Sequence, residues 1–83
     1  MQGVGEKLRA IVGELLETEV SSGADLARSA VPAWDSLNHL RLVMTVEEEF
    51  GIRFEQEEVA QIESLSQLHN LVEAKLAGAQ LPA

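Results

Sequence analysis

Hydrophobic residues recur every three or four positions along four stretches of the chain, with polar residues between them. This spacing places the apolar side chains on one face of an α-helix, so each stretch is expected to be helical. The expected helices cover residues 4–16, 35–50, 55–62 and 65–77. The third has room for only one or two turns. Because no strand hairpin and no internal repeat is evident, the expected fold is all-α, a small four-helix bundle.

Residues that favour helix ends mark the boundaries of the second and fourth helices. Asp35 suits an N-cap, because its carboxylate accepts from the unpaired amides of a first turn, and Gly51 suits a C-terminal stop. Ser64 followed by Gln67 fits a capping box. The small and polar residues at the end of the chain indicate a flexible tail over 78–83. Residues 1–77 are therefore expected to form the folded domain.

The segment from about Thr18 to Trp34 shows no helical period. Ser21, Ser22, Gly23 and Pro32 interrupt it, and its apolar residues are isolated. We expect a long loop between the first two helices. Loops longer than about 12 to 15 residues in compact domains are usually functional or disordered, so the length of this loop is itself informative.

The second expected helix carries apolar residues on two faces. One face is ordinary core packing, and its members are Leu42, Val43, Val46 and Phe50. On roughly the opposite side, Leu37, Leu40 and Met44 form a second apolar stripe. A bundle of 83 residues cannot fully bury both faces. We expect the second stripe to be exposed and to bind a partner; the alternative is that a neighbouring loop covers it.

The charge of the chain favours basic protein partners. Six Lys and Arg against fourteen Asp and Glu give a net charge of −8, which repels nucleic acid and anionic lipid. Seven acids and one base lie between Glu47 and Glu63, which suggests an acidic patch. The alternative is that the acidity only maintains solubility. The composition, 46% hydrophobic and 24% charged, is that of a folded globular domain.

Other features of the composition bear on disulfides, metal sites and cellular location. The chain has no cysteine, so the fold has neither a disulfide nor a cysteine zinc site. No apolar run approaches the roughly 18 residues needed to cross a membrane, and the first ten residues lack a secretory signal pattern. We expect a cytoplasmic protein. The two histidines are far apart in sequence, which gives little support for a metal site.

Ser36 falls in the first turn of the second helix, between its two apolar faces. The amides and the dipole at a helix N-terminus favour a phosphate attached at this position.

The run WDSLNHLRLVMTVEEEFGIRF resembles the signature of acyl carrier proteins: Asp-Ser-Leu, then an amphipathic helix that ends in Glu-Glu-Phe-Gly-Ile. The resemblance extends from the first helix through Leu76. It implies that a phosphopantetheinyl transferase attaches 4'-phosphopantetheine from coenzyme A to Ser36, flanked by Asp35 and Leu37. The arm then holds acyl groups as thioesters in fatty acid or secondary metabolite biosynthesis. Such a carrier is a shuttle and not an enzyme, and we expect a monomer.

The resemblance also implies a docking surface for enzymes with basic patches. It consists of Leu37, Leu40, Arg41, Met44, Glu47 and Glu48. The bundle interior of such carriers can take up the acyl chain. The residues expected to line that space are Val43, Val46, Phe50, Ile62 and Leu68.

The chain departs from the family pattern in two places. Ala33 and Trp34 fill a turn that usually has a glycine two residues before the aspartate. Trp34 is expected to pack on the end of the bundle; the alternative is a contact with partners or with the arm. Arg41 stands where fatty acid synthesis carriers usually have an acid. This favours a specialised carrier, and Asp35 favours acyl over aminoacyl cargo.

Two other functions are alternatives to the carrier, a hydrolase and an unmodified adaptor. A hydrolase built from Ser36, His39 and Asp35 is disfavoured, because Asp35 would not orient His39 and no glycine-rich turn supplies an oxyanion hole. We expect His39 to be partly buried and hydrogen-bonded, and His69 to lie on the surface. The stronger alternative is an unmodified helical adaptor that binds a basic protein through the same stripe. Ser36 discriminates between the two, since an adaptor does not need its hydroxyl.

Overall fold

The computed structural model describes residues 3–18 and 25–79, and these form an all-α fold without strands. Four α-helices and one short 3-10 helix follow one another along the chain. They are α1 (Val4–Leu16), η1 (Arg28–Ala30), α2 (Ser36–Phe50), α3 (Gln56–Gln61) and α4 (Leu65–Ala79). The four expected α-helices are therefore present, whereas η1 was not predicted. None of the described helices is long and apolar enough to span a membrane.

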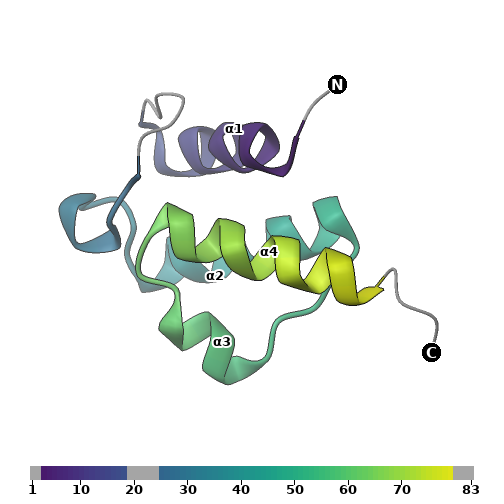
Figure 1. Cartoon of the computed structure of the whole chain (residues 1–83). Helices are drawn as coiled ribbons and strands as arrows, with labels where there is room; N and C mark the ends of the chain where they lie inside the picture. The colour runs from purple at the N-terminus through teal and green to yellow at the C-terminus, as the bar shows by residue number, and fades with distance from the viewer. Residues whose placement is uncertain (1–2, 19–24, 80–83) are drawn as a thin grey trace.

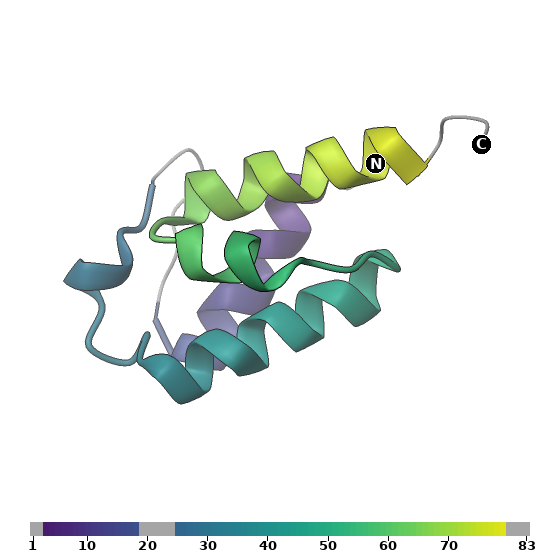
Figure 2. The same ribbon diagram turned by 90° about the horizontal axis from the view of Figure 1, so that it is seen from below.

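The helices surround one hydrophobic core. Helix α1 packs against both α2 and α4 (Figure 1). The short helix α3 lies on the other side of α2 and α4, as the view from below shows (Figure 2). Both α2 and α4 begin at the end of the bundle where η1 lies. The buried apolar side chains are Leu8, Val12, Leu16, Trp34, Leu42, Val43, Val46, Ile52, Ile62, Leu65, Leu68 and Val72.

The ends of α2 have the expected caps. Asp35 is the N-cap, and its carboxylate accepts a hydrogen bond from the Asn38 amide at 2.9 Å. Gly51 ends the helix at φ 65°, a left-handed conformation that glycine adopts without steric cost. Helix α1 ends in the same conformation at Glu17, with φ 50°. A side chain at this position is strained, which the sequence pattern did not indicate.

Helix α4 begins at Leu65 as expected, but it ends later than expected. It continues through Ala79, two residues beyond the expected end, so the folded part includes residues 78 and 79. The rest of the expected tail, residues 80–83, lies outside the described residues. At the start of α4 the hydroxyl of Ser64 accepts from the Gln67 amide, as in the predicted capping box. The Gln67 side chain, however, accepts from the amide of Glu63 and not of Ser64.

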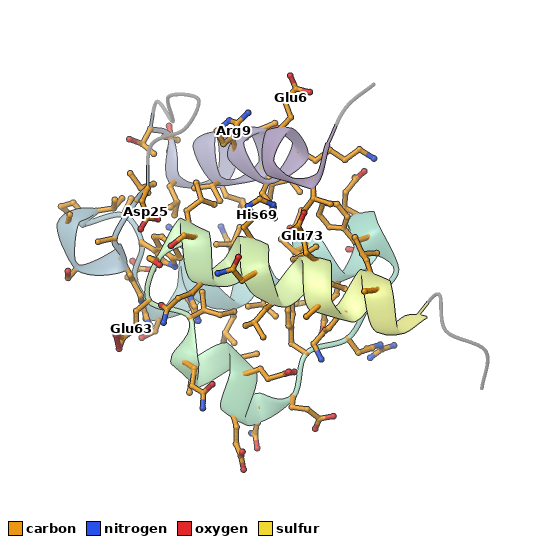
Figure 3. The ribbon with its side chains drawn as sticks, in the orientation of Figure 1. Glu6, Arg9, Asp25, Glu63, His69 and Glu73 are labelled. Atoms are coloured by element: carbon orange, nitrogen blue, oxygen red, sulfur yellow. The ribbon has the colours of Figure 1, made fainter. Side chains whose placement is uncertain are left out.

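The loop before η1 is tied to the start of α4. The carboxylate of Asp25 accepts from the Ser66 amide at 2.9 Å and from the Ser66 hydroxyl at 3.0 Å (Figure 3). These bonds, with the Ser66 amide as the largest contribution, hold the pKa of Asp25 below its ordinary value. An antiparallel bridge between Ala27 and Ser64 adds two backbone hydrogen bonds. The described part of the long loop is therefore anchored; residues 19–24 lie outside the described part.

Helix α3 is held by a capping box at its start and by an ion pair with α4. Glu55 and Glu58 form a capping box at its start. Glu58 also pairs with Lys75 of α4 at 2.7 Å. The Glu55 amide and Lys75 both lower the pKa of Glu58, the amide more strongly. Lys75 in turn lies over the ring of Phe54, 5.7 Å from its centre. These contacts join the short helix to α4.

Phe50 is a correction to the predicted core of α2. Leu42, Val43 and Val46 are buried as expected, but Phe50 is only half-buried. It is the last residue of α2, and Lys7 of α1 sits 5.9 Å from its ring centre. Phe50 therefore packs against the edge of the core and not within it.

Candidate functional site

Ser36 is the first residue of α2, and it is exposed. The turn before it is fixed by several hydrogen bonds. The Trp34 amide donates to the Val31 carbonyl at 2.9 Å, and the Asn38 side chain donates to the Ala33 carbonyl at 2.7 Å. The hydroxyl-bearing residue is therefore presented to solvent from a well-defined backbone, at the positive end of a 15-residue helix dipole.

Trp34 packs inward directly before this turn. Its side chain is only 3% exposed and belongs to the core, which confirms the expectation that it packs on the bundle. The guanidinium of Arg28 donates through Nε to the Trp34 carbonyl at 3.3 Å. An anchored aromatic residue thus stands directly before Asp35, the N-cap of α2. The anchor supports the position of Ser36 from the inside of the bundle.

His39 holds the Trp34 indole in place. The indole N–H donates to His39 Nδ1 at 2.9 Å, and His39 Nε2 lies 2.8 Å from the Val59 carbonyl oxygen of α3. His39 is 5% exposed, so it is buried and hydrogen-bonded, more deeply than expected. Both ring nitrogens are thereby engaged away from Ser36. The Asp35 carboxylate bonds the Asn38 amide, so the structure does not assemble Ser36, His39 and Asp35 as a hydrolase triad.

The second histidine, expected on the surface, keeps 37% of its side chain exposed. His69 lies on α4 and is partly buried (Figure 3). A Cβ added to Gly5 of α1 would lie 3.5 Å from His69 Cε1, an ordinary van der Waals distance, so the His69 ring lies directly beside Gly5. His69 Nε2 lies 3.4 Å from the carboxylate of Glu73.

The second apolar stripe of α2 is exposed. Leu37, Leu40 and Met44 are 59%, 54% and 62% exposed, and they are the large hydrophobic residues with high exposure in the described part of the chain. No loop within residues 3–18 and 25–79 covers them. Three large apolar side chains on one helix face are typical of an interaction surface. Met44 adds the adaptable side chain common in such surfaces.

The charged residues beside the apolar stripe of α2 differ in their contacts. Glu48 and Arg41 are exposed. The carboxylate of Glu47, in contrast, accepts from the Phe54 amide at 2.8 Å and so holds the segment after α2. Glu47 and Glu48 line a shallow hollow of about 460 Å³ with Met44 at the C-terminal end of α2. Glu47 therefore has a structural contact that the sequence did not indicate.

Four of the five residues expected to line an acyl-chain space lie in the packed core. Val43, Val46, Ile62 and Leu68 are buried, and Phe50 is half-buried at the edge. Uptake of a chain among these side chains requires them to move apart. Its occurrence stays a prediction.

Sequence reasoning missed the residues that support Ser36 from a distance in the chain. Arg28, Asn38 and Val59 were not singled out, although each contacts the turn or the Trp34–His39 pair. Their bonds go to backbone carbonyls or cross 20 positions of sequence, and such contacts leave no periodic pattern. The tryptophan and histidine five residues apart were the one available signal.

No protein-family model matches the chain, and a search of curated proteins finds no match.

Proposed function

We propose that this protein is an acyl carrier that bears 4'-phosphopantetheine on Ser36. The observation that carries the proposal is the placement of Ser36: an exposed hydroxyl at the start of α2, on a hydrogen-bonded turn, beside an exposed apolar stripe. The motif Asp35-Ser36-Leu37 supports it through the resemblance to carrier proteins. Ser36 is thus both the reactive position and the start of the helix that partners would contact.

The residues around Ser36 fit an attached phosphate. Ser36 is exposed, so a transferase can reach its hydroxyl, and the helix N-terminus favours a negative group at that position. In the transfer, the Ser36 hydroxyl would displace the nucleotide part of coenzyme A and lose its proton to the transferase. The bound arm would supply a thiol that holds acyl groups as thioesters. The chain itself would present that thiol and leave catalysis to its partners.

The docking surface would be the Leu37, Leu40 and Met44 stripe with Glu48 beside it. The exposed apolar side chains would be buried against the partner enzyme. The acidic side chains would steer basic partners, because the net charge of −8 gives long-range attraction. Arg41 adds a positive charge within this surface and favours a partner set other than that of fatty acid synthesis. We propose that the carrier is cytoplasmic and that it carries acyl rather than aminoacyl groups.

The test is the intact mass of the protein after incubation with coenzyme A and a broad-specificity phosphopantetheinyl transferase. Wild type should gain one phosphopantetheine, and Ser36→Ala should gain none. Ser29→Ala is the matched control, because Ser29 is also an exposed serine and lies in η1. It should be modified like wild type.

The exposed stripe also suits the adaptor alternative, which needs no prosthetic group. A folded wild-type protein that gains no mass with several transferases would contradict the carrier proposal. In that case the stripe and the acidic side chains would indicate an adaptor for a basic protein.

A further inference from the structure

We propose that His39 is an acid-sensitive latch that holds the Trp34 indole inside the bundle. The proposal rests on the chain of contacts from Trp34 through His39 to Val59, which joins the turn before Ser36 to α3. His39 is the buried polar side chain among the described residues. The latch does not depend on whether Ser36 is modified.

The hydrogen bonds define the protonation state of the latch. An indole N–H can only donate, so His39 Nδ1 must accept, and the Val59 carbonyl can only accept, so Nε2 must donate. His39 is therefore the neutral imidazole with its proton on Nε2. A second proton would sit on Nδ1 and face the indole N–H, whose nitrogen is 2.9 Å away. The Trp34 bond cannot survive that protonation.

The surroundings offer no replacement partner for a protonated His39. No described carboxylate forms an ion pair with its ring; the ion pair of a histidine in the described chain is that of His69 with Glu73. The carboxylates of Asp35 and Glu58 are engaged with Asn38 and with Glu55 and Lys75. The charged side chains on the turn before α2, on α2 beside His39 and on α3 are Asp35, Arg41, Glu57 and Glu58, and Arg28 bonds the Trp34 carbonyl. A buried positive charge without a partner is unfavourable.

Protonation releases one side of the latch and keeps the other. The Nε2–H bond to the Val59 carbonyl persists in the imidazolium, so α2 and α3 stay joined. Only the indole loses its partner, and a buried indole N–H without one is costly. Trp34 therefore moves toward solvent. The turn before Ser36 loses its inner anchor, although the Asn38 and Arg28 bonds to that turn remain.

The chain offers a direct measurement of this release. Trp34 is the sole tryptophan and there is no tyrosine, so intrinsic fluorescence reports on Trp34 alone. Emission is recorded as the pH is lowered from about 8, where a free imidazole is neutral, to the point at which helicity begins to fall. Far-ultraviolet circular dichroism is recorded on the same samples. We expect wild-type emission to shift to longer wavelength in a one-proton transition while helicity is retained.

Two variants separate the histidines. His39→Gln keeps an uncharged side chain at all these pH values and should show no transition. His69→Gln removes the other histidine and should behave like wild type. Wild-type emission that does not change with pH would overturn the latch, as would the same transition in His39→Gln. Emission that changes only together with loss of helicity would overturn it too, because it would report global unfolding.

A second measurement keeps the proposal testable if His39→Gln does not fold. Nitrogen-15 NMR of the wild-type imidazoles distinguishes the two neutral tautomers. At about pH 8 we expect the proton of His39 on Nε2. A proton on Nδ1 would contradict the hydrogen-bond pattern and overturn the latch.

Discussion

Both faces of α2 carry large hydrophobic residues, but one face is buried in the core and the other is exposed to solvent. Leu42 and Val46 are fully buried against the rest of the bundle, whereas Leu40 and Met44, on the same helix, are more than half exposed. Helical periodicity identifies both faces but does not say which one the fold fills. The difference shows that the inner face is sufficient to dock α2. The outer stripe is therefore free to serve binding.

The largest expected contrast is between two leucines of α2. Leu42→Ala should lower the free energy of unfolding by about 2 to 5 kcal/mol, since it leaves a cavity in the core. Leu40→Ala should change it by no more than about 0.5 kcal/mol, because that side chain is exposed. Urea denaturation measures both. Equal losses would mean that the outer stripe is packed in solution, against a second copy or a segment of the chain.

The loss of unfolding free energy in Phe50→Ala should lie between the losses in Leu42→Ala and Leu40→Ala. A fully buried phenylalanine truncated to alanine typically costs about 3 to 5 kcal/mol, and Phe50 is half-buried, so we expect about 2 kcal/mol for Phe50→Ala. Urea denaturation under the same conditions gives the value. Lys7→Ala tests how much of this loss comes from the cation over the ring. A loss for Phe50→Ala as large as that for Leu42→Ala would mean that Phe50 is buried in the core.

The smallest expected change in stability distinguishes the adjacent acids Glu47 and Glu48. Glu47→Lys removes the acceptor of the Phe54 amide and should cost about 1 kcal/mol. Glu48→Lys is exposed and should stay within about 0.5 kcal/mol. Thermal unfolding compares them, and under the proposed carrier function acyl transfer to a basic partner enzyme should fall in both. Glu48→Lys that unfolds as readily as Glu47→Lys would show that stability, and not docking, explains its effect on transfer.

The helices and the two faces of α2 could be predicted because their signals are local. Apolar residues three or four apart define a face, and Asp35 and Gly51 mark helix ends within one turn. The short helix α3 could also be located from its pattern. Even the burial of Trp34 followed from the size and apolar character of its side chain.

The remaining features depend on pairs of residues that are distant in sequence. Asp25 reaches Ser66, and His39 reaches Val59, across 41 and 20 positions. One polar side chain in a loop does not indicate which distant amide it will bind. The partial burial of Phe50 likewise depends on how the last turn of α2 packs against α1, where Lys7 lies over its ring. These features required the arrangement of the helices in space.

The bond from Asp25 to Ser66 has a consequence for folding kinetics. It closes 41 positions of chain, and the entropy cost of that closure precedes any gain from the bond itself. Helices α1 and α2 can form their local turns earlier, whereas the start of α4 receives this cap only after the two segments have met. We therefore expect the bond to form after these local turns. If it forms after the folding transition state, it mainly sets how slowly the native protein opens, not how quickly it forms.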